Sequence, residues 1–172
     1  MKSFFVCLSL LVTSAVFSQS STDEAEVRKL VEELITSFNT HDFTSLKANS
    51  TDDVSWVNVM GKWWKGRDEV VNSHYEIFNK IFNGVKFEKQ DLSIRFITPD
   101  VILVHVLQHV GAFFPPDGVD RGSNRRPEAD NNLQLVYVRK DGKWMLSAAH
   151  NIEVAPPRPP ANTGVSAKYR RS

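Results

Sequence analysis

The second half of the chain consists almost entirely of long runs rich in β-branched and aromatic residues. Four such runs cover residues 85–97, 101–114, 131–139 and 143–154. The first two are joined by Thr98-Pro99-Asp100, which is typical of a turn, and the last two flank Asp141-Gly142, a strong hairpin signal. Four long strands in this order predict a curved antiparallel sheet, which must be covered on at least one face.

The first half of the chain supplies the helices that are expected to cover one face of this sheet. Apolar residues recur at spacings of three and four over residues 23–38, which predicts an amphipathic helix, and residues 41–50 indicate a second short helical segment. A strand over 54–59, a turn at Gly61 and a return strand at Trp63-Trp64 follow. A further helix runs to about Phe82, with His74 on or beside its apolar face. The fold class is therefore α+β, with helices on one face of the sheet.

The N-terminal segment has the features of a secretory signal peptide. Lys2 precedes an apolar run from Phe4 to Val12, and small residues surround a cleavage point after Ser18. Residues 1–18 are thus expected to be removed and the protein exported to the periplasm or beyond. The domain is expected over residues 19–154, and a proline-rich, basic tail over 155–172. Residues 115–130, which offer almost nothing apolar to bury, predict a mobile loop.

Composition excludes several classes of partner and chemistry. The single cysteine, Cys7, lies in the signal segment, so the processed protein would contain no thiol. Without Lys2, 20 basic residues balance 20 acidic ones, so neither nucleic acid nor a membrane surface is expected as a partner once the signal is removed. Both faces of the later strands are fairly apolar, although helices can cover only one. This predicts a homodimer formed through the other sheet face.

Histidines are the candidates for acid/base chemistry, because an imidazole titrates near neutral pH. His74 is expected on the inner helix. His150 is expected on the inner face of the last strand if the alternation from Lys143 is unbroken, and His105 could point into the same cavity. His109 is interpreted as a rim residue. His105 and His109 would lie roughly 13 Å apart on one strand, too far for one metal ion, and no metal site is expected.

A second set of residues could contact a substrate. Trp56 and Trp63 are most simply core or dimer-interface residues, but in a cone-shaped fold they and Tyr137 could also give a cavity an apolar wall that accepts rings. Asn58 lies on the Trp56 side of its strand, where an amide needs a hydrogen-bond partner. It either orients a ligand or caps the Gly61 turn.

Three phrases of the sequence resemble a known family. They are the segment from Phe38 to Phe82, the phrase RFITPDVILVHV, and the ending VRKDGKWMLSAAHNIEV. Together they are similar to the SgcJ/EcaC branch of SnoaL-like proteins, within the nuclear-transport-factor-2-like superfamily. The resemblance implies a cone-shaped α+β roll, also described as cystatin-like, with helices on its concave face, and a dimer. Among the family positions it carries over are Asn58, His74, His105, His150 and Asn151.

The resemblance implies a small-molecule pocket but leaves its use open. One hypothesis is an enzyme without a cofactor, in which His74 and His150 transfer protons, His105 assists, and Asn58, Asn151 and the aromatic wall bind a small apolar or cyclic substrate. It would be an isomerase, cyclase, dehydratase or hydrolase. The alternatives are a ligand-binding protein without catalysis and a dimeric assembly module. Histidine nitrogens within about 7 Å of each other in one cavity would favour the enzyme.

Overall fold

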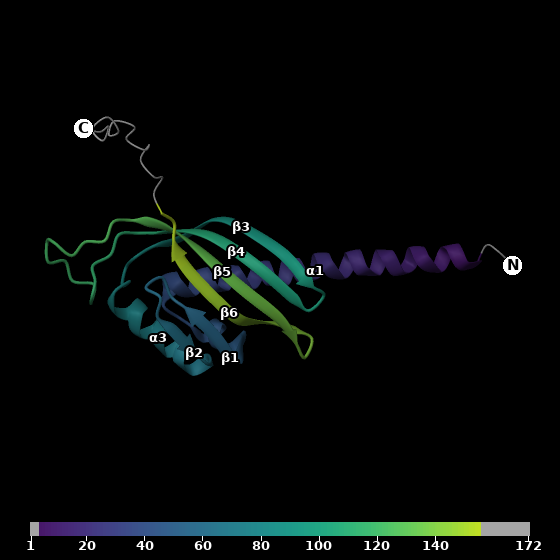
Figure 1. Ribbon diagram of the computed structural model, residues 1–172, viewed down its shortest axis with the longest axis horizontal. Coiled ribbons are helices and arrows are strands. Elements are labelled where there is room, and N and C mark those ends of the chain that lie inside the picture. The colour runs from purple at the N-terminus through teal and green to yellow at the C-terminus, as the bar shows by residue number, and fades with distance from the viewer. Residues whose placement is uncertain (1–3, 156–172) are drawn as a thin grey trace, which may run out of the picture.

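The computed structural model describes the backbone of residues 4–155 and the side chains from residue 21 onward (Figure 1). Its elements follow the predicted order: α1 (Phe4–Thr40), α2 (Thr44–Ala48), β1 (Ser50–Val57), β2 (Trp63–Lys65), α3 (Arg67–Lys80), β3 (Phe87–Thr98), β4 (Val101–Val110), β5 (Ala129–Lys140) and β6 (Lys143–Glu153). The α+β prediction is confirmed. Apart from Ala155, the predicted tail lies outside the described residues.

All six strands form one curved, open sheet in the order β2-β1-β6-β5-β4-β3. Neighbouring strands are antiparallel except β1 and β6, which run parallel. This parallel pair departs from the predicted antiparallel sheet. It arises because β1 comes from the first half of the chain and joins the edge of the meander formed by β3 to β6.

The β5–β6 hairpin contains both a predicted and an unpredicted feature. Asp141 and Gly142 have φ of 51° and 76°, the left-handed pair that a two-residue hairpin turn requires. Farther along, Tyr137 pairs with Leu146 but Val136 pairs with Ala148. Ser147 is therefore an extra residue, a β-bulge that reverses the in-and-out alternation of the rest of β6.

The two faces of the sheet differ in burial. The inner face carries a row of apolar residues that crosses all six strands and packs under the helices: Trp64, Trp56, Ala149, Leu135, Val104 and Ile94. On the outer face, the alternate residues of β4 are partly exposed, whereas the inner-face residues of the same strand are buried. One face therefore holds the core, and the other holds apolar side chains that the described helices leave open.

Polar contacts hold helix α1 to the domain at its end and near Ser21, on either side of its buried apolar residues. At its end, the Asn39 amide exchanges hydrogen bonds of 2.8 and 2.9 Å with the backbone of Phe87 on β3. Near Ser21, Asp23 is the first buried side chain among residues 21–155, and it accepts hydrogen bonds from Arg139 and from Trp144 Nε1. The part of α1 before this anchor projects past the sheet (Figure 1). Among the described residues, no helix is long and apolar enough to cross a membrane.

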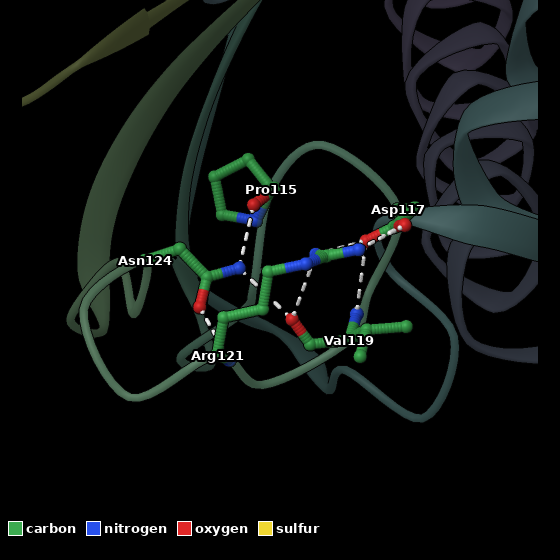
Figure 2. Close-up of polar contacts among 5 residues, drawn as sticks. All are labelled: Pro115, Asp117, Val119, Arg121 and Asn124. Carbon is green, nitrogen blue, oxygen red and sulfur yellow. Dashed lines mark hydrogen bonds and ion pairs between the residues drawn. The ribbon is translucent and has the colours of Figure 1, made fainter.

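The loop between β4 and β5 has an internal polar framework (Figure 2). Both guanidinium Nη atoms of Arg121 donate to the Asp117 carboxylate at 2.7 Å, and they lower the pKa of that carboxyl to about 2. The Asn124 amide donates to Pro115 O at 2.7 Å, and its oxygen accepts from Arg121 N. Polar contacts thus give a defined shape to a segment whose composition predicted only mobility.

The same loop packs against the end of α3. The Phe113 ring lies 4.8 Å from that of Phe82, measured between centroids. Gly118 has φ of 83°, and a Cβ there would lie 2.3 Å from Lys80 O, so the close approach requires glycine. The loop therefore packs against the C-terminal end of α3.

Replacing Asp23 with Ala is expected to lower the free energy of unfolding by about 3 kcal/mol, because the largely buried Arg139 would lose its buried partner and keep only the exposed Asp100. The control is Glu24→Ala, which removes an exposed pair with Arg28 and should change stability by less than about 1 kcal/mol. Urea unfolding measures both variants. Equal losses would contradict an anchoring role for Asp23.

Candidate functional site

His74 lies at the centre of an aromatic cluster on the inner face. It is 3% exposed and projects from α3 toward the sheet. Its ring centroid lies 4.4 Å from that of Trp56 and 5.2 Å from that of Trp64, both in edge-on contacts. Three phenylalanine rings complete the surroundings: Phe38 from α1, Phe43 before α2, and Phe78 one turn farther along α3. Aromatic side chains thus surround the imidazole.

The hydrogen bonding and burial of His74 define its chemical state. Its Nδ1 lies 2.7 Å from Val70 O, so Nδ1 carries the proton and donates it, which leaves Nε2 as the nitrogen with a lone pair. Burial lowers the pKa from 6.5 to about 4, although the bond to Val70 opposes this shift. His74 is therefore neutral at physiological pH and a weak base.

His105 and His150 lie on the opposite face of the sheet. A single outer-face row crosses the six strands: Trp63, Val57, His150, Gln134, His105 and Ser93. Two strand spacings separate the histidines, which corresponds to about 10 Å between their backbones. His150 is exposed. The prediction that His150 points inward is wrong, because the Ser147 bulge reverses the alternation and turns Ala149 and Asn151 inward instead.

The structure thus does not bring the three predicted catalytic histidines together. His74 is sealed among inner-face rings, while the other two share the outer face. His109 is also on the outer face, where its Nδ1 lies 2.9 Å from Asp130 Oδ1. Within residues 21–155, no three His, Cys, Asp or Glu side chains form a group that could hold a metal ion.

The predicted substrate-binding residues also divide between locations. Trp56 and Tyr137 are buried on the inner face, at 3% and 2% exposure. Trp63 is on the outer face and 57% exposed, with its Nε1 donating to Ser55 Oγ at 2.7 Å. Asn58 Oδ1 accepts from Met60 N and Lys62 N at 3.0 and 2.9 Å, so the capping role proposed as its alternative is the one observed.

Four side chains each hold one buried polar atom without a hydrogen-bond partner among the described residues. They are Thr51 Oγ1 near the start of β1 and, on the inner face, Trp64 Nε1, Gln108 Oε1 and Asn151 Oδ1. Gln108 was not among the predicted site residues. The sequence nevertheless predicts that Gln108 faces inward, because it continues the alternation of Val104, Val106 and Val110 on β4. An amide in an apolar register needs a hydrogen-bond partner.

Two hollows lie elsewhere in the described part of the chain, and neither is lined by Trp64, Gln108 or Asn151. One is a cavity of about 10 Å³ between α1 and the sheet, which is enough for about one water molecule and is lined by Leu34, Asn49 and Tyr137 among others. The other is a surface hollow of about 250 Å³ beside the start of α3. Its Arg67 guanidinium is bound to Asp52 Oδ1 and Ser50 O, so its charge is already paired.

The burial of His74 predicts a specific dependence of stability on pH. The unfolded chain binds a proton near pH 6.5, whereas the folded chain binds it only near pH 4. Stability should therefore fall as pH decreases through this window, by roughly 3 kcal/mol from His74 alone. Urea unfolding of wild type and His74→Leu at pH 7 and pH 4 measures the difference. The same pH dependence in both proteins would contradict the assigned state of His74.

Comparison with known proteins agrees with this architecture. The SnoaL-like domain family matches residues 27–151. An uncharacterised protein with a cystatin-like fold from Caulobacter vibrioides is 30% identical with a TM-score of 0.72, and the alignment covers 78% of this chain and 92% of that one.

Two more distant structures share the fold. An NTF2-like protein of unknown function from Pseudomonas putida is 20% identical with a TM-score of 0.63, covering 77% of this chain and 87% of that one. The hexachlorocyclohexane dehydrochlorinase LinA-type3 from Novosphingobium barchaimii is 14% identical with a TM-score of 0.66, covering 78% and 88%. No curated protein matches the sequence. The match over residues 27–151 and the 30% identical relative show that the chain belongs to the SnoaL-like domain family, with the NTF2-like, cystatin-like fold.

Proposed function

We propose that the protein binds a small, neutral, ring-containing molecule on the inner face of its sheet and holds it without proton transfer by the histidines. One observation carries this proposal: the side chains that converge on His74 are aromatic rings, and His74 itself is uncharged. Such a surface favours apolar and cyclic molecules, which can pack edge-on or offset against the rings. A ligand would enter by displacing or rotating some of these rings.

The acid/base hypothesis has less support from the geometry. Proton transfer between His74 and His150 requires both groups at one substrate, and the sheet lies between them. A base with a pKa near 4 is also poorly matched to neutral pH. The dehydrochlorinase from Novosphingobium barchaimii suggests that this fold can support elimination chemistry, but at 14% identity it is a guide to fold alone.

Branch membership and export belong to the same proposal. The three sequence phrases support placement in the SgcJ/EcaC branch. The signal-like run from Phe4 to Val12 supports export with cleavage after Ser18, which N-terminal sequencing of the exported protein would check. Cleavage there would retain the anchor at Asp23. The exported protein would then bind its ligand outside the cytoplasm.

The proposal includes a homodimer formed through the outer face. Apolar side chains along its centre are only partly buried in one chain, among them Leu103, Leu107, Val136 and Met145. Trp63 and Ile152 are 57% and 58% exposed on the same side. A second copy would bury this surface, as patches of this kind on soluble proteins commonly require.

The binding proposal predicts that a screen of cyclic metabolites by native mass spectrometry finds at least one ligand for the wild-type protein. Ala149→Leu should abolish that binding, because the larger side chain occupies the inner face beside Trp56. Ala25→Leu is the control, since Ala25 is exposed on α1 and lies outside both sheet faces. The absence of any ligand, or equal binding by both variants, would contradict the proposal.

The dimer predicts a mass of twice the chain in sedimentation experiments. Val136→Glu, at the centre of the outer face, should shift the protein to monomer because it would place a charge in the interface. Val119→Glu, on the exposed loop, should leave the dimer intact. A monomeric wild type, or a dimer that tolerates Val136→Glu, would refute an interface on this face.

A further inference from the structure

A line of amide side chains crosses the inner face beside the aromatic cluster. Gln108 on β4 pairs directly with Asn131 on β5, and both are buried, at 1% and 7% exposure. Asn151 on β6 lies diagonally across from Asn131, because Leu133 pairs with Asn151 and Asn131 pairs with Glu153. Direct and diagonal neighbours on one face lie within about 8 Å of each other. The inward curvature of the sheet brings the ends of such side chains closer still.

The hydrogen bonding of this line is incomplete. Gln108 Oε1 and Asn151 Oδ1 are buried acceptors without a partner among the described residues. A buried polar group left unpaired typically costs about 1–3 kcal/mol, so folded proteins rarely retain one without a use. Leucine or methionine would fill these positions without that cost. The amides therefore have a partner outside the described chain, or they reduce stability for no gain.

The surroundings indicate which partner fits. Both orphan atoms are neutral acceptors, so they require a hydrogen-bond donor. The nearest rows of the inner face are apolar, with Leu133, Val106 and Ala149 buried. A cation would be costly in such surroundings, whereas a neutral O–H or N–H group would not.

We infer that Gln108 and Asn151 receive the hydroxyl or N–H groups of a neutral ligand whose ring packs toward Trp56 and His74. This assignment rests on the proposed binding function and names the chemical class of its ligand: a small cyclic alcohol, phenol or amide. Each carries a donor for the two amides and an oxygen that could accept from the unpartnered Trp64 Nε1, whereas a hydrocarbon, an ether without a donor or an anion does not meet the need for a neutral donor. Gln108 supplies an acceptor at one end of the line and Asn151 at the other.

The test compares phenol with anisole, its methyl ether, by ligand-observed NMR on the whole protein. The ring is the same, but only phenol can donate a hydrogen bond. Wild type should bind phenol about tenfold more tightly than anisole, which is the effect of one hydrogen bond to a buried acceptor. Phenol has one hydroxyl, so either Gln108→Met or Asn151→Leu, whichever removes the accepting amide, should abolish this preference. Gln134→Met, on the exposed outer face of the next strand, should keep it.

Urea unfolding of the same variants provides the second readout. If the amide serves a ligand, Gln108→Met should unfold at the same urea concentration as wild type or at a higher one, because an unpaired buried group has been removed. A clear fall in stability would show that the amide supports the fold, through an internal water, and would overturn the inference.

The possible failures are distinguishable. Equal binding of phenol and anisole by wild type would overturn the assignment of a donor ligand and leave the proposed binding function standing. Binding of neither probe, together with no ligand in the metabolite screen, would overturn both. A phenol preference that survives in Gln108→Met and in Asn151→Leu would place the donor's partner elsewhere and also refute the assignment.

Discussion

One inserted residue in β6 determines which side chains face the interior. Before Ser147, Trp144 and Leu146 point inward, and after it Ala149 and Asn151 do so. Without the bulge, Ala148 and His150 would occupy those positions, because a shift of one residue moves every later side chain to the other face. The composition of the inner face, and therefore its chemistry, depends on this irregularity.

The resulting interior contains aromatic rings and amides. Phe38, Phe43 and Phe78 pack with Trp56 around a neutral His74, and this packing stabilises the contact between the helices and the sheet. The amides of Gln108 and Asn151 contribute nothing comparable to stability while they lack partners. Unpaired amides lower the stability of a core, so their presence on the inner face is a reason to expect a ligand. The outer face, with its histidines and partly buried apolar residues, is suited to assembly.

Much of the fold could be predicted from local patterns. Period-two runs identified β3 to β6, and Asp141-Gly142 identified the tight hairpin between the last two. The site was harder to predict. The segment Ser147-Ala148-Ala149 contains no glycine, proline or charge that marks a bulge, so His150 was assigned to the wrong face. Asn58 had two reasonable roles, and only the positions of Met60 N and Lys62 N decided between them. The alternation of β4 predicts that Gln108 faces inward, but the candidate site was assigned to the histidines of the same strand instead.

His74 lies on an uncharged inner face, separate from the other candidate histidines, and this separation favours ligand binding over proton transfer. A histidine-selective NMR titration with nuclear Overhauser contacts tests it most directly. We expect that His74 keeps its proton on Nδ1, stays neutral down to about pH 4, and shows contacts to the rings of Phe38 and Trp56. Titration of His74 near pH 6.5, or a contact between the rings of His74 and His150, would contradict it.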